Sequence, residues 1–332
     1  MSSFGGRRLK DRWDVADIPD QRGRVVVVTG ANAGLGFATA SQLAASGATV
    51  VLAVRNPERG EAAIAEMRAA VPGADLALQQ VDLASLDSIR AATRQLRSSH
   101  PRIDVLINNA GVVFTQRTLT ADGFELQFGT NHLGHFALTA GLIGSMLDVE
   151  GSRVVTIASL GHWFPFHFDL DHVRCERGYN RFAAYTRSKV ANLLFTYELN
   201  RRLRSAGAPT ISVAAHPGNS DTAIADHLPG MEFMHRHFSA LAQPAASGML
   251  PALRAATDPT VGGGQYLGPD RLAETRGHPI VVRSSSRTQD RALMARLWEL
   301  SEEWTGIPFD LCGNTDAIDG RVPGTGAEPL GR

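Results

Sequence analysis

Cysteine is scarce in this chain of 332 residues, which contains only Cys175 and Cys312. Two cysteines so far apart provide neither a disulfide framework nor the ligand spacing of a zinc site, and His162, His167 and His172 do not have that spacing either. We therefore expect no metal ion. We also expect a reducing compartment, the cytoplasm, as the location.

The chain also lacks an excess of charge and long apolar segments. Its 33 basic and 33 acidic residues cancel, so no net field favours nucleic acid or an anionic membrane. No run approaches the ~18 consecutive apolar residues of a membrane span, and the polar start Met1-Ser2-Ser3 does not resemble a secretory leader. The expected partner is a small molecule, with no nucleic acid and no transmembrane segment.

The sequence does contain an alternation of short β-branched segments and longer amphipathic ones, which is the pattern of βαβ units around a parallel sheet. The valine-rich segment 24–29 fits a strand that is covered on both faces. We expect one domain over residues 23–308, a doubly wound parallel α/β sheet of Rossmann type with about seven strands. The expected strands are 24–29, 48–54, 75–81, 103–107, 153–158, 210–215 and 264–267, and the expected helices are 34–46, 57–70, 85–98, 120–147, 179–204, 244–256 and 289–304.

Three segments do not follow this alternation. Residues 1–22 are polar and are expected to form a surface arm, which Trp13 and Ile18 could anchor. Residues 219–240 follow the sixth expected strand, at the edge where ligands of such sheets bind, and we interpret them as a substrate lid. Residues 309–332 are rich in glycine, aspartate and proline and are expected to form a flexible tail.

A glycine-rich turn follows the first expected strand and opens the first expected helix. It has the spacing Gly-x-x-x-Gly-x-Gly at Gly30, Gly34 and Gly36, and it contains Asn32 and Leu35. Glycines let the backbone turn sharply and approach a pyrophosphate, whose charge faces free N–H groups at the helix N-terminus. A glycine cluster is also typical of an ordinary tight turn, but its place at the first βα junction favours a nucleotide site.

The end of the second expected strand indicates which nucleotide is bound. An acidic residue there would bind a ribose 2′-hydroxyl, but Arg55 stands at this position, and a guanidinium suits a 2′-phosphate. We therefore favour NADP, with NAD possible because a solvated arginine is also common at a strand end. Asp82, after the third strand, could accept a hydrogen bond from the adenine amine or cap the helix that begins near Ser85. We assign Asp82 and the adjacent Leu83 to the cofactor site.

Tyr185 and Lys189 lie four residues apart in an expected helix, so their side chains share one face. A free tyrosine titrates near pH ~10, and its use as an acid or base near neutrality requires stabilisation of the anion by about three units, roughly 4 kcal/mol. A neighbouring ammonium provides such stabilisation. Each residue alone has an ordinary alternative, because a tyrosine at helical spacing commonly lies in a core and such a lysine is commonly solvated.

Several motifs together resemble the short-chain dehydrogenase/reductase family over residues 24–267. They occur in the family's order: Thr29-Gly30-x-x-x-Gly34-x-Gly36, Asn108-Asn109-Ala110-Gly111 after the fourth strand, Asn131 in the long helix, Ser159 after the fifth strand, Tyr185-x-x-x-Lys189, and Pro217-Gly218 followed by Thr222. The resemblance implies an NAD(P)-dependent oxidoreductase that moves hydride between nicotinamide and a carbonyl carbon. It also implies that the cofactor site includes Asn109, Ala110, Gly111, Pro217 and Gly218.

The same resemblance implies a role for each residue of the reacting centre. Tyr185 donates a proton to the substrate oxygen in reduction and accepts one in oxidation. Lys189 stabilises the phenolate and binds the nicotinamide ribose, and Ser159 orients the substrate oxygen. Asn131 holds a water that links the lysine to solvent, and Thr222 fixes the carboxamide of the nicotinamide.

Within that family, the chain looks like the retinol dehydrogenase group and its bacterial relatives. The similarity rests on the stretch 192–199, on the long interval from Ser159 to Tyr185, and on Arg55. It implies a preference for NADP and an apolar aldehyde, ketone or alcohol as substrate. Nothing in the sequence specifies a retinoid, and the hydrophobic N-terminal anchor common in vertebrate members is missing.

The substrate pocket and the oligomeric state leave alternatives open. The aromatic stretch 162–168 and the Met/Phe-rich stretch 231–238 could wall an apolar pocket, or they could cover the sheet edge or a dimer contact. Apolar Leu193, Leu194 and Phe195 leave open a homodimer of the kind that the family forms through paired helices. The alternatives to a carbonyl/alcohol oxidoreductase are a nucleotide-binding sensor or scaffold without turnover, and an enzyme that uses NAD or acts on a carbon–carbon double bond.

Overall fold

The structure is a computed structural model that describes residues 12–164, 166, 168, 170, 178–219 and 245–311. Its centre is one eight-stranded sheet in the order β3-β2-β1-β4-β5-β6-β7-β8, in which β1 to β7 run parallel and β8 is antiparallel to β7. This confirms the doubly wound sheet expected from the sequence. The strands are β1 (Val25–Thr29), β2 (Thr49–Val54), β3 (Leu76–Gln80), β4 (Val105–Asn108), β5 (Arg153–Ile157), β6 (Ile211–Ala215), β7 (Tyr266–Arg271) and β8 (Arg276–Val281).

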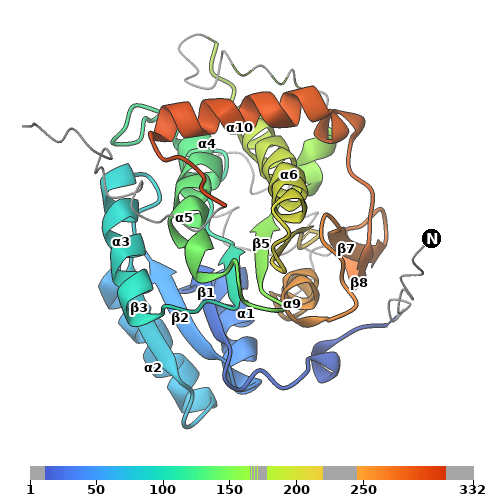
Figure 1. Cartoon of the computed structure of the whole chain (residues 1–332). Coiled ribbons are helices and arrows are strands. Elements are labelled where there is room, and N and C mark those ends of the chain that lie inside the picture. The colour runs from blue at the N-terminus through green and yellow to red at the C-terminus, as the bar shows by residue number, and fades with distance from the viewer. Residues whose placement is uncertain are drawn as a thin grey trace, which may run out of the picture.

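Helices cover both faces of this sheet, which makes three layers (Figure 1). One face is covered by α1 (Gly34–Ala45), α2 (Pro57–Ala70) and α9 (Leu250–Thr257), which follows the short α8 (Ala245–Gly248). The other is covered by α3 (Leu86–Ser99), α5 (Gly134–Leu142) and α6 (Arg181–Ser205). Across α6 lies α10 (Arg291–Thr305), drawn in red at the top of Figure 1. Short helical turns occupy Val15–Asp17, Ile143–Ser145, Leu160–Trp163 and Ser286–Gln289.

The sheet has one strand more than expected from the sequence, and the additional strand is β8. β8 contains Gly277 and Pro279, which weaken a strand pattern in the sequence. They are tolerated here because β8 is the edge strand of the sheet, where an N–H group on the outer side needs no partner. The hairpin also lengthens β7 beyond the expected segment 264–267.

The long helix expected over residues 120–147 is present from residue 126 to residue 145, but it begins six residues later than expected and contains a π-helical turn. The helical part begins with α4 (Leu126–Phe128), continues through a π-helical turn (Gly129–Leu133) and then through α5. Glu125 starts it by accepting hydrogen bonds from the backbone N–H groups of Gln127 and Phe128. Close contacts require its glycines, because a Cβ at Gly134 would overlap the Leu83 carbonyl. A π-turn inside a helix is rare and is often found at functional sites.

The apolar core on the α10 side is rich in aromatic rings. Trp298 of α10 stacks on Phe195 of α6 with ring centroids 5.9 Å apart, and it meets Phe136 of α5 edge-on at 5.3 Å. Leu194 and Phe195, which left a dimer open, are buried in this core, and Leu193 is buried in a separate cluster against the sheet. These three residues therefore offer no exposed surface to a second copy.

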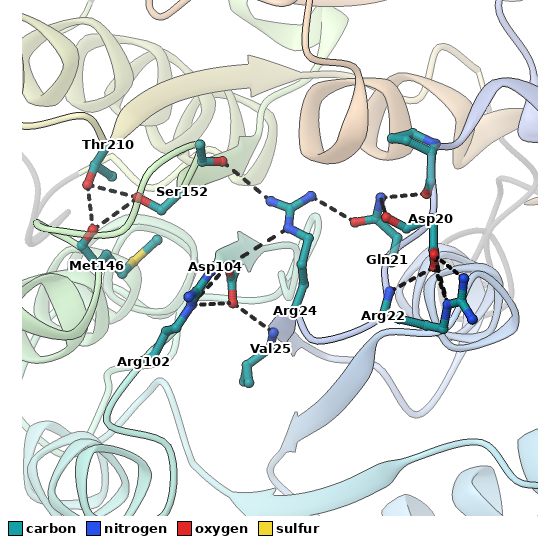
Figure 2. A network of polar contacts seen from close by, with 12 residues as sticks. Asp20, Gln21, Arg22, Arg24, Val25, Arg102, Asp104, Met146, Ser152 and Thr210 are labelled. Carbon is teal, nitrogen blue, oxygen red and sulfur yellow. Dashed lines mark hydrogen bonds and ion pairs between the residues drawn. The ribbon is translucent and has the colours of Figure 1, made fainter.

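The amino ends of the strands are held by a polar network (Figure 2). The buried carboxylate of Asp104 accepts hydrogen bonds from the backbone N–H of Val25 at 2.9 Å and from the Arg102 guanidinium at 2.7 Å. Arg24 lies 4.0 Å from the same carboxylate and donates to the Gln21 side chain at 2.8 Å. This ties the segment before β1 to the start of β4, at the edge opposite to the carboxyl ends of the strands. Trp13 of the same segment is buried in the core on the α1 side.

Candidate active site

The motifs found in the sequence converge on the carboxyl edge of the sheet. The glycine turn follows β1, the segment 109–111 follows β4, Ser159 follows β5, and the segment 217–218 follows β6. Because β1, β4, β5 and β6 are neighbours and parallel, their carboxyl ends lie side by side, at the edge where open α/β sheets bind their ligands. Tyr185 and Lys189 come to this edge from the first turns of α6.

Ser159, Tyr185 and Lys189 lie together at the end of β5. The start of α6 is fixed by Asn180, whose side chain accepts hydrogen bonds from the N–H groups of the first turn. The Ser159 hydroxyl lies near enough to the Tyr185 phenol to favour the phenolate, and the Ser159 oxygen accepts a hydrogen bond from the backbone N–H of Gly161 at 3.1 Å. The ammonium of Lys189 lies 5.7 Å from the centre of the Tyr185 ring.

Burial dominates the protonation of both helix residues. It raises the pKa of Tyr185, against which the hydrogen bond from Ser159 acts, and it lowers the pKa of Lys189 to about 8. The Lys189 ammonium donates to the Ile157 carbonyl at 3.0 Å. From the sequence, Lys189 is expected to lower the pKa of Tyr185. The protein groups alone raise this pKa instead, because both side chains are desolvated.

Asn131 lies in the π-helical turn and faces the loop after β4. Its side chain accepts a hydrogen bond from Val112 N–H at 2.8 Å and donates to Val112 C=O at 3.0 Å and to Ser188 Oγ at 3.0 Å. A Cβ at Gly111 would lie 3.2 Å from Asn131 Oδ1 and 3.9 Å from Lys189 Nζ. A glycine at position 111 therefore keeps the space between the asparagine and the lysine open.

His135 was missed by the sequence analysis, although it connects two of the motifs. Its Nδ1 lies 3.0 Å from the Asn131 carbonyl and its Nε2 2.9 Å from Thr29 Oγ1. A carbonyl can only accept, so Nδ1 carries the hydrogen and Nε2 accepts from the threonine. Burial lowers the pKa of His135 to about 4, which keeps the imidazole neutral near pH 7. The only sequence signal was its place one helical turn after Asn131.

Thr29 is the centre of the contacts between β1 and the loop after β4. Its hydroxyl accepts from the backbone N–H groups of Asn109 and Ala110 at 2.8 and 2.9 Å, and its carbonyl accepts from the Asn109 side chain at 2.8 Å. These bonds hold the β4 loop beside the glycine turn. A Cβ at Gly30, whose φ is +67°, would lie 3.0 Å from Ala110.

The glycine turn leaves the N-terminus of α1 accessible. Gly36 has no room for a Cβ, which would overlap the Gly30 carbonyl and the Asn109 side chain. The residue before the helix, Ala33, has no side chain that could accept from the first N–H groups. In α2, α3, α6 and α10 a side chain does so. The free N–H groups of α1 can therefore receive an anion.

The residues expected to bind the adenosine half of the cofactor lie at the ends of β2 and β3. Arg55 directly follows β2, and its side chain is exposed. Asp82 does not cap α3, since Ser85 is the N-cap residue and accepts from Ser88 N–H. One Asp82 oxygen accepts from Ala84 N–H at 2.9 Å. Leu83 is buried, and its carbonyl lies against Gly134.

One aromatic ring lies against Tyr185, and a second ring packs on the first. The Phe114 ring lies 5.1 Å from the Tyr185 ring and 4.5 Å from that of Phe182. Trp163 and Phe164 of the stretch 162–168 are 50% and 59% exposed, whereas His162 of the same stretch is buried with its ring 5.5 Å from that of Tyr266 in β7. Thr222, the whole of the stretch 231–238 and almost all of the expected lid lie outside the described residues.

Comparison with known proteins agrees with this arrangement. The family model described as short chain dehydrogenase matches residues 24–232. Retinol dehydrogenase 11 of Homo sapiens is 37% identical over 289 residues, 87% of each chain, and retinol dehydrogenase 14 of Mus musculus is 35% identical over 328 residues, 92% of each chain. The crystal structure of an uncharacterised protein from Mycobacterium paratuberculosis is 40% identical, with a TM-score of 0.76 over 90% of this chain and 99% of that one. No helix among the described residues is long and apolar enough to cross a membrane. The chain belongs to the short-chain dehydrogenase/reductase family.

Proposed function

We propose that the chain is an NADP-preferring oxidoreductase that interconverts an apolar carbonyl compound and its alcohol, with Ser159, Tyr185 and Lys189 as the reacting centre. The observation that carries the proposal is the meeting of these three side chains at the end of β5. A sensor or scaffold would not need a partly buried phenol beside a buried ammonium at a ligand-binding edge, since desolvation disfavours the charged forms of both groups.

The residues at this edge fit a dinucleotide. The free N–H groups at the start of α1 suit the pyrophosphate, and the two glycines without room for a Cβ let the cofactor approach the backbone. The nicotinamide supplies or accepts the hydride. In this assignment Asn109, Ala110 and Gly111 lie along the cofactor, and Pro217, Gly218 and Thr222 lie at its nicotinamide end.

The protein groups handle the proton. Tyr185 protonates the substrate oxygen as the carbonyl is reduced, and it takes the proton back in oxidation. Ser159, whose hydroxyl lies near the phenol, holds the same oxygen. Lys189 stabilises the phenolate that remains, and Asn131, fixed by Val112 and Ser188, positions a water that connects the lysine to solvent.

The preference for NADP rests on Arg55. Its exposed guanidinium directly after β2 can pair with a 2′-phosphate, and Asp82 with Leu83 completes the adenosine side. Titrating NADPH and NADH against the protein by nicotinamide fluorescence tests this, and tighter binding of NADH would contradict it. Arg55→Gln should weaken NADPH at least tenfold and leave NADH unchanged. Arg59 in the first turn of α2, replaced in the same way, serves as the control.

The substrate class rests on the aromatic surroundings of Tyr185 and on the relatives, which are named for the dehydrogenation of retinol. We place the protein in the cytoplasm on the basis of its few cysteines. A screen of NADPH consumption over aliphatic, aromatic, terpenoid and steroid carbonyl compounds should find the best kcat/KM among apolar ones. No turnover of any of them, with NADPH bound, would favour the sensor instead.

A further inference from the structure

The hairpin between β7 and β8 has an unusual backbone. Leu272, Ala273 and Glu274 have consecutive φ angles of 49°, 53° and 64°, in the left-handed region that residues with a Cβ rarely adopt. Such a conformation persists only where the surrounding contacts hold it, and it is frequent at ligand sites. The contacts made by this hairpin tip therefore point to what it is for.

The tip contacts the loop that follows β6. The carbonyl of Thr275 accepts from Asn219 N–H at 2.9 Å, and the Glu274 carboxylate lies 3.2 Å from Nε2 of His216. The fit is close, because a Cβ at Gly218 would come within 2.5 Å of the Thr275 carbonyl oxygen. The left-handed tip is thus what brings Glu274 and Thr275 onto the segment 216–219.

His216 connects Glu274 to the next residues of the loop through hydrogen bonds at both ring nitrogens. A carboxylate accepts hydrogen bonds, so the imidazole hydrogen lies on Nε2, and this leaves Nδ1 as an acceptor. Gly218 N–H donates to that Nδ1 at 3.2 Å. One tautomer of the ring therefore satisfies both partners, and it is the tautomer that Glu274 selects.

The surrounding residues hold the His216 ring in one position. It is fully buried, its centroid lies 5.1 Å from that of Tyr266, and its backbone N–H donates to Leu267 at 2.9 Å. Gly268 leaves the space that the ring occupies, because a Cβ there would overlap the imidazole. Glu274, Thr275 and Gly268 together fix where the Pro217-Gly218 turn lies.

We propose that Glu274 is a positioning residue for the nicotinamide half of the cofactor, acting through His216 on the Pro217-Gly218 turn. The inference rests on the proposed function, in which this turn lies at the nicotinamide end. Glu274 itself touches neither the cofactor nor the substrate. Its removal should weaken the contacts at that end only, and the adenosine half, at the ends of β2 and β3, should be bound as before.

Calorimetric titration tests this with two ligands, the reduced cofactor that the wild type binds and a matching fragment without nicotinamide. The fragment is adenosine 2′,5′-bisphosphate for NADPH, or ADP for NADH. Glu274→Ala should weaken the cofactor at least fivefold and the fragment less than twofold. Glu274→Gln should stay within twofold of wild type for both, because its amide oxygen can still accept from Nε2. Arg271→Ala, an exposed change in the same hairpin, is the control.

Two results would overturn the inference while the proposed function stands. One is a Glu274→Ala variant that binds the cofactor as tightly as the wild type. The other is an equal loss of affinity for the cofactor and the fragment, which would indicate a general structural role. A wild type that binds neither NADPH nor NADH would instead refute the proposed function, and this inference with it.

Discussion

The buried ammonium of Lys189 should lower the free energy of unfolding of the protein. Burial lowers its pKa from 10.5 to about 8, and 2.5 units correspond to about 3.4 kcal/mol of disfavoured charge at 1.36 kcal/mol per unit. Lys189→Met removes that charge and keeps most of the side-chain volume. The Ile157 carbonyl loses one donor but retains Asn192 Nδ2 at 3.1 Å. We therefore expect the free energy of unfolding of the variant without cofactor to exceed that of the wild type by about 2 kcal/mol at pH 7. The hydrogen bond that is lost offsets about 1 kcal/mol of the gain.

The advantage of the variant should decline at alkaline pH. The folded-state pKa of Lys189 lies below the unfolded one, so between about pH 8 and 10.5 the unfolded wild type holds more protons than the folded one. Wild-type stability therefore rises with pH in this window, and Lys189→Met lacks this rise. Urea unfolding at pH 7, 8, 9 and 9.5 measures the difference. Lower stability of Lys189→Met at pH 7, or a difference that does not shrink by about half at pH 9.5, would refute the reasoning.

Three further substitutions test other parts of the account. Gly36→Ala should weaken NADPH binding at least tenfold in a fluorescence titration, since the new Cβ overlaps the Gly30 carbonyl; unchanged affinity would remove the glycine turn from the cofactor site. Trp298→Ala should cost about 3–5 kcal/mol in urea unfolding, because it leaves a large cavity between α6 and α10, and a cost below about 1 kcal/mol would show that α10 does not hold this core. Asp104→Ala should cost about 3–5 kcal/mol by leaving Val25 N–H without its acceptor and the partly buried Arg24 guanidinium without its ion-pair partner; a loss that disappears in 1 M salt would show that exposed charges dominate instead.

The parallel sheet could be predicted from the sequence because each of its strands is marked by local chemistry. β1 is a continuous valine segment, and α2 and α3 begin at residues whose side chains accept from the first turn. β8 could not be predicted in this way. Its glycine and proline make sense only once the strand is known to lie at an edge.

The residues proposed for the reacting centre were predictable from their spacing, but their surroundings were not. Tyr185 and Lys189 share a helix face as expected, whereas the tyrosine's neighbours Ser159 and Phe114 come from segments distant in the sequence, and the burial raises its pKa. The π-helical turn that contains Asn131 adjoins glycines in close contact with residues distant in the sequence, such as Leu83 at Gly134. The bridge made by His135 joins β1 to that helix and has no sequence pattern of its own.

Turnover by Tyr185→Phe tests the central claim most directly. The substitution removes one hydroxyl and keeps the ring that lies against Phe114, so the fold and the cofactor site should be unchanged. On the best carbonyl substrate, kcat should fall at least a thousandfold while the Kd for NADPH stays within twofold of wild type. A variant that keeps more than about a tenth of wild-type kcat would show that Tyr185 is not the proton donor.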